Sequence, residues 1–139
     1  MLFGEYQHNI DDKGRMIIPA KFRDDLGEVF IVTKGLDNCL AVYSMGEWAE
    51  IEKQIRALPL SKSRDLQRFW FSGATEVSAD KQGRIVIPSN LRAYGRLEKD
   101  VVVIGVSNRV EIWDKESWES QAQSLTPDSI VEAMSQLGF

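Results

Sequence analysis

Internal repetition constrains this sequence more than any other feature. A shift of 69 positions places residues 11–23 on residues 80–92, and Asp, Gly, Arg, Ile, Pro and the final Arg are identical in the two segments. After one extra residue near Gly95 the match resumes at a shift of 70, which places Trp48 on Trp118. The chain is therefore a tandem duplication, and its fold must accommodate two related halves.

Each repeat predicts the same short elements in the same order. Asp-x-x-Gly-Arg is a turn sequence, and the apolar residues after it form a short buried strand that ends at a proline, since proline cannot donate a ladder hydrogen bond. Proline also suits the start of a helix, and a β-hairpin follows in each copy. The predicted elements are strands 16–18 and 85–87, helices 20–26 and 89–94, and hairpin strands 29–33, 40–43, 101–106 and 109–113.

Helical spacing of apolar residues predicts two helices between the repeats and one in the tail. A helix over residues 45–57 has Trp48 and Ile55 on one face, and a second helix is predicted over residues 63–71. In the tail, Thr126 is a typical N-cap and precedes a proline, which predicts a short amphipathic helix. We expect a first repeat with its helix, a connecting helix, a second repeat and an acidic tail, over residues 1–60, 61–76, 77–120 and 121–139.

The size of the repeats predicts how they pack. A half of about 50 residues buries too little surface to be stable alone, so the two halves must share one core. Duplication and small halves together predict a pseudo-two-fold pair in which strands of the two copies interleave. The two Asp-x-x-Gly-Arg turns then become related positions on one surface. The expected fold class is mainly β with short α-helices, that is α+β.

The charge of the chain is unevenly distributed. The 139 residues carry a net charge of −4, which argues against nucleic acid as a partner because phosphate binding depends on basic side chains. However, residues 111–139 contain six acids and one base, whereas residues 13–23 and 81–97 contain four bases each and no acid. The negative average therefore hides two basic segments, one in each repeat.

Composition and missing motifs exclude several classes of protein. With 43% hydrophobic residues the chain can form a core. The single cysteine, Cys39, and the single histidine, His8, exclude a disulfide framework and leave too few ligands for a Cys/His zinc site. We find no apolar run of roughly 20 residues, no signal-peptide pattern, and no phosphate-loop, GxSxG or CxxC motif of an enzyme. We expect a soluble cytoplasmic protein without catalytic residues, metal, cofactor, membrane contact or small-molecule substrate.

The repeated turn has the chemistry of a DNA contact. An arginine after glycine in a tight turn projects its guanidinium beyond the backbone, where it can bind a guanine edge or a phosphate. Glycine lets the duplex approach. The aspartate four residues earlier can hold the arginine in one rotamer or can accept from a cytosine amino group. An isolated Asp–Arg pair is usually an exposed ion pair of little consequence, but here both copies keep Asp, Gly and Arg. The candidate DNA-binding residues are Arg15, Arg84, Lys13, Lys81, Gly14 and Gly83, with Asp11 and Asp80 as supporting residues of the motif.

Other polar and aromatic residues allow two interpretations each. Lys21, Arg23 and Arg92 are possible phosphate contacts, although such residues can equally serve packing or pairing. The aromatic side chains could stack on bases, but helical spacing and repeat symmetry favour the core or a subunit contact. These are Trp48, Phe69, Trp70, Phe71, Trp113 and Trp118. We expect His8 and Cys39 to be structural.

At these residues the chain resembles the MraZ family of bacterial transcriptional regulators, which are relatives of the AbrB-type swapped-hairpin DNA-binding proteins. The resemblance covers roughly residues 1–120 and includes both Asp-x-x-x-Arg motifs, at residues 11–15 and 80–84. It rests on segments 4–6, 9–15, 18–19, 36–40, 80–85, 87–88 and 108–113.

This resemblance implies a tandem-duplicated swapped-hairpin fold, a double-split β-barrel with pseudo-two-fold symmetry. It also implies a nucleoid-associated regulator of the division and cell-wall gene cluster, including its own gene, that assembles into a ring homo-oligomer. Head-to-tail contacts in a ring present every subunit in the same sense, which suits promoter direct repeats in double-stranded DNA. The alternative is a non-catalytic, antitoxin-like, oligomeric protein-interaction module in which DNA binding is secondary.

Overall fold

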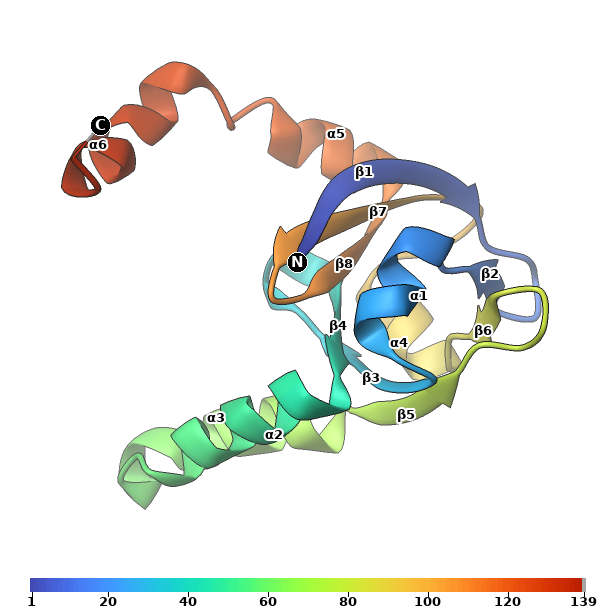
Figure 1. The fold of residues 1–139 in the computed structure, drawn as a ribbon, viewed down its shortest axis with the longest axis horizontal. Coiled ribbons are helices and arrows are strands. Elements are labelled where there is room, and N and C mark those ends of the chain that lie inside the picture. Colours follow the sequence, from blue (N-terminus) through green and yellow to red (C-terminus); the bar gives the residue numbers. More distant parts are fainter. Residues whose placement is uncertain (139) are drawn as a thin grey trace.

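The computed structural model describes residues 1–138, and each repeat contributes four strands to it (Figure 1). The strands are β1 (Leu2–Asn9), β2 (Arg15–Ile17), β3 (Val29–Lys34), β4 (Leu40–Ser44), β5 (Thr75–Ser78), β6 (Arg84–Val86), β7 (Asp100–Ser107) and β8 (Val110–Asp114). The helices are α1 (Ala20–Leu26), the 3-10 turn η1 (Leu36–Asn38), α2 (Met45–Arg56), α3 (Leu60–Ser72), α4 (Ser89–Tyr94), α5 (Lys115–Ala122) and α6 (Pro127–Gln136).

The strands of the two repeats interleave. Six of them form one antiparallel sheet in the order β1-β7-β8-β4-β3-β5, and β2 pairs with β6 in a separate two-stranded ribbon. The sheet order is symmetric about the β8–β4 pair. The first strand of each repeat pairs with the hairpin of the other repeat, β1 with β7 and β5 with β3. The expected α+β class is confirmed, while the name of a swapped-hairpin, double-split barrel stays an inference from the resemblance.

One hydrophobic core lies between the curved sheet, the ribbon and the short helices α1 and α4 (Figure 1). Equivalent residues of the two repeats enter it, since Ile18 and Ile87 are both fully buried. Four residues further along the chain in each repeat, Phe22 of α1 and Leu91 of α4 pack into the same core. A single repeat would leave its share of this core exposed, so the shared core expected from the size of the halves is confirmed.

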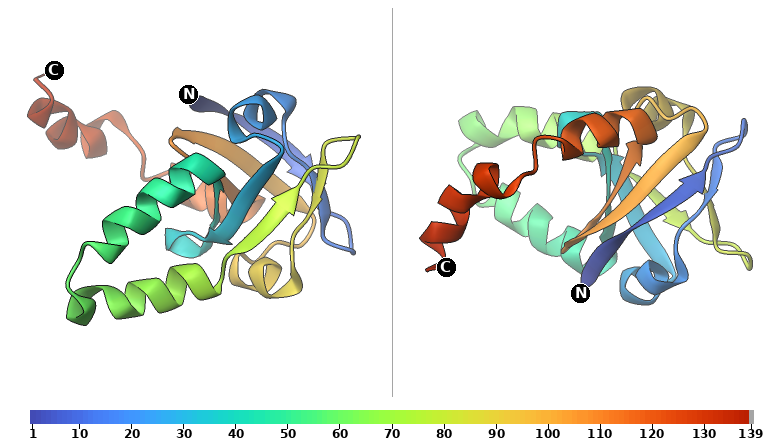
Figure 2. Two further views of the ribbon diagram at one scale, coloured as in Figure 1. Left: turned by 60° about the horizontal axis from the view of Figure 1, so that its bottom comes forward. Right: turned by 90° about the horizontal axis from the view of Figure 1, so that it is seen from above.

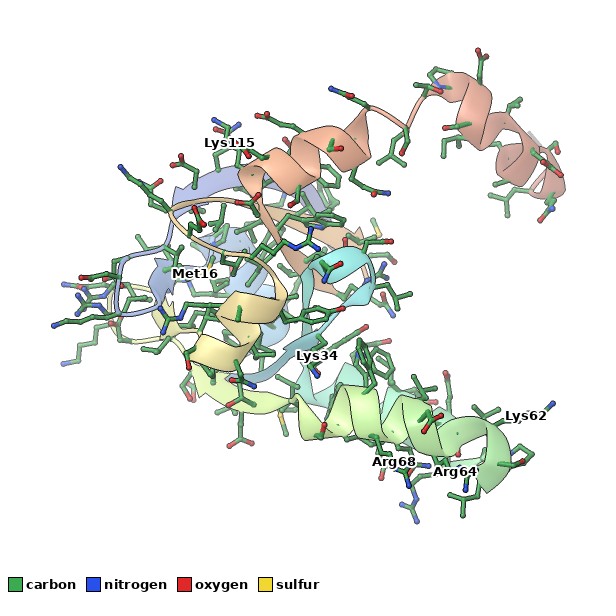
Figure 3. All side chains as sticks on the ribbon, turned by 180° about the vertical axis from the view of Figure 1, so that it is seen from behind. Met16, Lys34, Lys62, Arg64, Arg68 and Lys115 are labelled. Carbon is green, nitrogen blue, oxygen red and sulfur yellow. The ribbon has the colours of Figure 1, made fainter. Side chains whose placement is uncertain are left out.

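Two helical arms leave the body at the end away from the ribbon (Figures 1 and 2). The first arm is the hairpin of α2 and α3, and the second is α5 with α6. Tyr43, Trp48 and Trp70 fasten the hairpin to the sheet, with ring centroids 5.8–5.9 Å apart. Three cations project from α3, namely Lys62, Arg64 and Arg68, and of these Lys62 lies nearest the tip of the hairpin (Figure 3).

Most predicted elements are confirmed, some of them to the residue. Helices 20–26 and 89–94 are α1 and α4, and helix 45–57 is α2 within one residue. Thr126 caps α6 through a reciprocal hydrogen-bond pair with Ser129. The sequence did not predict β1, β5 or α5, and α3 begins three residues earlier than expected. None of the helices in residues 1–138 is long and apolar enough to cross a membrane.

Candidate nucleic-acid interface

The β2–β6 ribbon brings the two repeated turns onto one surface. In its antiparallel register Arg15 lies opposite Val86, and Ile17 lies opposite Arg84. Because side chains alternate along a strand, these four residues share the outer face, while the central residue of each strand is buried. The prediction of a short buried strand at 16–18 and 85–87 is confirmed for the first and last residues of each run and wrong for the middle one, since Ile17 is 42% exposed and Val86 is 55% exposed. The outer face of the ribbon therefore carries two arginines and two aliphatic side chains.

In the first turn one aspartate holds both the backbone and the arginine. Oδ1 of Asp11 accepts hydrogen bonds from the backbone N–H groups of Lys13 and Arg15, at 3.0 and 2.8 Å. Oδ2 accepts from Nε of Arg15 at 2.7 Å. The carboxylate thus closes the turn and fixes the direction of the guanidinium at the same time.

The second turn has the same geometry. Oδ1 of Asp80 accepts from the backbone N–H groups of Gln82 and Arg84 at 2.8 and 2.9 Å, and Oδ2 accepts from Nε of Arg84 at 2.9 Å. In each turn the backbone N–H of the arginine, with its guanidinium, holds the pKa of the aspartate below its ordinary value. Within residues 1–138 the Nη atoms of Arg15 and Arg84 have no hydrogen-bond partner. The Asp–Arg bond therefore uses Nε and leaves the paired Nη edge for a ligand.

Each turn glycine lies under an arginine of the opposite repeat. Gly14 and Gly83 have φ values of +81° and +80°, which side chains rarely adopt. A Cβ on Gly14 would lie 2.9 Å from Nε of Arg92, and a Cβ on Gly83 would lie 2.8 Å from Cζ of Arg23. Nε of Arg92 also donates to the carbonyl of Ile87 at 3.1 Å. Both arginines therefore support the turn of the other repeat, which is the packing role that the sequence left open.

The remaining candidate cations differ in their surroundings. Lys13 and Lys81 are exposed in the two turns. Nζ of Lys21 lies 3.7 Å from the ring centroid of Phe3, which is itself 52% exposed. Nε of Arg23 is buried and has no hydrogen-bond partner in the described part of the chain. Contact of these helix cations with phosphate stays a prediction.

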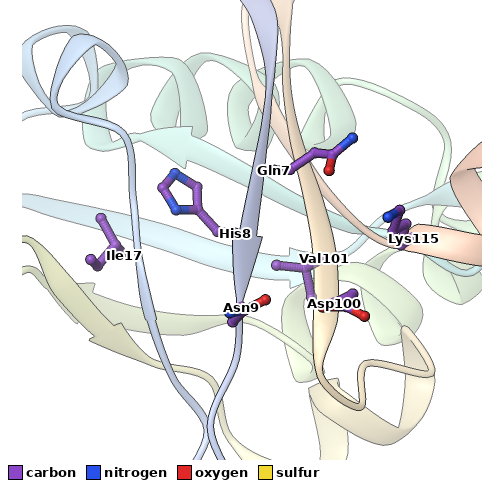
Figure 4. A pocket seen from close by; sticks show the side chains of 7 residues that line it. All are labelled: Gln7, His8, Asn9, Ile17, Asp100, Val101 and Lys115. Carbon is purple, nitrogen blue, oxygen red and sulfur yellow. The ribbon is translucent and has the colours of Figure 1, made fainter.

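A shallow hollow of about 350 Å³ lies beside the ribbon (Figure 4). It is lined by Gln7, His8, Asn9, Ile17, Asp100, Val101 and Lys115. His8 points from β1 toward Ile17, and burial lowers its pKa, so the ring is neutral at pH 7 and adds no charge to the ribbon. Lys115 lies on the other side of β1. No group of three or more His, Cys, Asp or Glu residues among residues 1–138 is placed to hold a metal ion.

The aromatic side chains pack away from the ribbon. Trp113 is 4% exposed and contacts Trp118 with ring centroids 5.4 Å apart, and Trp48 contacts Phe71 at 5.3 Å. These pairs lie where the helical arms meet the sheet, as repeat symmetry favours. Cys39 is 1% exposed, and burial raises the pKa of its thiol to about 12.

Fold and site together define a class: a duplicated α+β protein that presents two aspartate-braced arginines on one antiparallel ribbon. A sequence model of the family described as "MraZ protein, putative antitoxin-like" matches the chain twice, over residues 1–69 and 70–137. The chain therefore belongs to the MraZ family. The two matches fall on the two repeats.

Relatives of high identity carry the same family name. A protein of Acetivibrio thermocellus named Transcriptional regulator MraZ is 57% identical over 143 residues, which cover 100% of both chains. Proteins of the same name from Desulforamulus reducens and Caldanaerobacter subterraneus are each 60% identical to this chain. The match covers 86% of this chain and 85% of the first relative, and 89% of this chain and 88% of the second. The similarity thus extends over nearly the whole chain.

Proposed function

We propose that this protein is a sequence-specific, DNA-binding transcriptional regulator and not an enzyme. The observation that carries the proposal is the pair of turns with equivalent hydrogen bonds on the ribbon, in which Asp11 braces Arg15 and Asp80 braces Arg84. The relatives named as transcriptional regulators support the same conclusion.

The shape of the ribbon suits the major groove of DNA. B-DNA admits a two-stranded antiparallel ribbon there, and the outer face meets the base edges. With Nε held by the aspartate, the two Nη atoms of each arginine can donate to O6 and N7 of a guanine. Ile17 and Val86, which lie on the same face, can contact thymine methyl groups. Lys13 and Lys81 at the turns then contact the phosphates, so the two basic segments of the sequence act as one surface.

We further propose that several copies act together. In a ring with head-to-tail contacts each subunit offers its ribbon in the same rotational sense. Such an assembly binds short boxes in the same orientation, spaced close to one duplex turn of about 10 bp. By the family resemblance, these boxes lie in the promoter of the division and cell-wall gene cluster, which includes the regulator's own gene. The protein then acts on the nucleoid in the cytoplasm.

Binding of the two arginine variants to duplex DNA tests this function. We expect Arg15→Ala and Arg84→Ala to stay folded and to lose about 1–3 kcal/mol of binding free energy per contact, more when several subunits bind together. Arg56→Ala is a matched control, because Arg56 is also in an exposed i,i+4 ion pair, with Glu52, but on the helical hairpin. Fluorescence anisotropy with promoter DNA, and circular dichroism for folding, provide the measurements.

Two outcomes would contradict the proposed site. If Arg15→Ala and Arg84→Ala bind promoter DNA like the parent, the ribbon does not read DNA. If both variants unfold, the arginines are structural.

A third measurement tests the electrostatics: despite the net charge of −4, the logarithm of affinity should fall steeply with the logarithm of salt concentration. A flat response would remove the phosphate contacts from the proposal.

The family description favours a second candidate function, an antitoxin-like module that binds a protein. In that case the ribbon is secondary and an oligomer forms without a DNA partner. An intact oligomer that shows no affinity for promoter duplex at low salt would favour this candidate over the first.

A further inference from the structure

Helix α6 is well formed, but within residues 1–138 none of its side chains is buried. Thr126 and Ser129 form a reciprocal capping box, and Pro127 occupies the first turn. Yet the helix has only 10 residues and buries none of them, and isolated helices of that length are marginal in water. The apolar side chains of α6 and of its C-cap residue are exposed by 38–75%, and these are Ile130, Val131, Met134 and Leu137.

These apolar residues form a stripe that fits a binding surface. Ile130, Met134 and Leu137 follow the i, i+4, i+7 spacing of one helix face. The acidic residues of the helix, Asp128 and Glu132, lie on the opposite flank. A helix with this pattern is stabilised when its stripe enters an apolar groove and its acidic flank stays in water.

A cleft of suitable chemistry lies on the other arm. It has a volume of about 400 Å³ and lies between α3 and the η1 turn. Leu66, Phe69 and Trp70 of α3 line one wall, at the i, i+3, i+4 spacing of one helix face. Leu36 on the opposite wall is 77% exposed. The α3 wall of the cleft is therefore apolar, while the rest of the lining includes two positive and two negative side chains, namely Lys34, Arg109, Asp37 and Glu111.

The charges of the two arms are complementary. Residues 116–138 contain four acids and no base. Helix α3 contains three bases and one acid, and Lys62 and Arg64 project from it (Figure 3). Inside the cleft the charges balance, so the attraction comes from α3 and not from the cleft lining. Because the acids of α6 lie opposite its stripe, this attraction steers the approach of the arm and adds few direct ion pairs.

We propose that α6 of one copy binds the cleft between α3 and η1 of a neighbouring copy. Within one chain α6 and the hairpin of α2 and α3 are separated in Figure 1 and in the left view of Figure 2, and no residue of α6 lines the cleft, so the stripe and the cleft do not meet. Stripe and cleft are different surfaces, so the contact can continue head-to-tail from copy to copy, as the proposed ring requires, whereas a reciprocal exchange of α6 between two copies would close as a dimer. This inference rests on the proposed self-association and names its surface; it makes no use of the ribbon.

Mixed cysteine variants test the contact directly, without DNA. One preparation carries Met134→Cys, and a second, distinguished by a tag, carries Leu66→Cys, both in the full-length chain. Cys39 needs no replacement because it is buried and its thiol has a pKa of about 12. After mixing and mild oxidation we expect a disulfide between the two differently tagged chains. Ser135→Cys is the matched control, since residue 135 lies on the flank of α6, and it should crosslink several-fold less.

A second measurement follows the assembly itself. We expect Met134→Asp to raise the concentration for half-dissociation by about tenfold or more in sedimentation velocity, and Ser135→Asp to leave it unchanged. Absence of the crosslink, or a disulfide only within a Met134→Cys/Leu66→Cys double variant, would overturn the inference. Such a result with an oligomer still present would leave the proposed DNA binding and ring untouched and assign the subunit contact elsewhere.

Discussion

The two turn glycines are equivalent in sequence, yet the structure predicts different costs when each is replaced by alanine. Both have φ close to +80°, so both variants share the strain of a left-handed residue. Their surroundings differ. A Cβ on Gly14 would lie 2.6 Å from the backbone carbonyl oxygen of Ile87, which cannot move without the ribbon. The nearest atoms to a Cβ on Gly83 are all from the guanidinium of Arg23, at 2.8–3.1 Å, and this flexible end can shift.

These contacts set the expected magnitudes. The left-handed conformation costs about 1–2 kcal/mol for a residue with a Cβ, and this applies to both variants. Forcing a methyl group against fixed backbone adds about 1–3 kcal/mol, and this applies to Gly14→Ala alone. We therefore expect Gly83→Ala to lower the free energy of unfolding by about 1–2 kcal/mol and Gly14→Ala by about 2–5 kcal/mol. Gly46→Ala is the control, because Gly46 lies in α2 with nothing within 4 Å of its Cβ position.

Urea denaturation followed by tryptophan fluorescence measures all three variants. Gly46→Ala should leave the free energy of unfolding unchanged or raise it by up to about 1 kcal/mol, since alanine is the better helix former. The slope against urea should stay that of the parent, so that shifts in the midpoint report stability. Equal losses for Gly14→Ala and Gly83→Ala would refute the contact argument, and a stable Gly14→Ala would refute the conformation of the turn as well.

Three further predictions follow from buried and paired groups and from the proposed assembly. The Cys39 thiol should react with a thiol reagent at pH 8 only after unfolding, and fast labelling of the native chain would contradict this. The pKa of this thiol is about 12 in the folded protein, above the ordinary 9.0. The free energy of unfolding, relative to that of Cys39→Ala, should therefore decrease as the pH rises from about 9 to about 12. The folded pKa values of Asp11 and Asp80 lie below 3.8, so the stability they add is complete above that value and is lost as the pH falls through the folded pKa. The melting-temperature difference between the parent and an Asp11→Asn/Asp80→Asn variant should thus be constant from about pH 5 to 8 and shrink at lower pH, whereas a drift between pH 5 and 8 would speak against it. Inserting about 5 bp between two operator boxes should weaken binding more than inserting a full turn of about 10 bp, and a footprint over a single inverted repeat would argue against direct repeats.

Elements with a regular pattern of their own could be predicted from the sequence. A proline followed by a short helical segment predicted the bounds of α1 and α4, and Thr126-Pro127 predicted where α6 begins. β1 was missed because its inward positions include Gly4 and His8, which interrupt the alternation of apolar residues. α5 was missed because it buries none of its residues, although the match of Trp48 with Trp118 pointed to a second copy of α2.

The candidate site was only half visible in the sequence. The repeated Asp-x-x-Gly-Arg turns identified the braced arginines, because their partners are local. Ile17 and Val86 were not recognised as surface residues, since a run of three apolar residues does not show which of them faces outward. The contact between Arg92 and Gly14 could not be predicted, because it joins α4 of the second repeat to the turn of the first. The pairing of β2 with β6 brings these two segments together, and the sequence does not show that pairing.

The pseudo-two-fold axis passes through the centre of the ribbon, where Met16 pairs with Ile85. The two ends of the ribbon are related by this axis but are not identical, since one turn carries Asp12-Lys13 and the other Lys81-Gln82. Two separate copies of a single repeat would present the same end twice and would read a box and its reverse complement equally well. Fusion of two diverged repeats in one chain removes that ambiguity. Under the proposed function, each subunit thereby gains the means to distinguish the upstream side of its box from the downstream side.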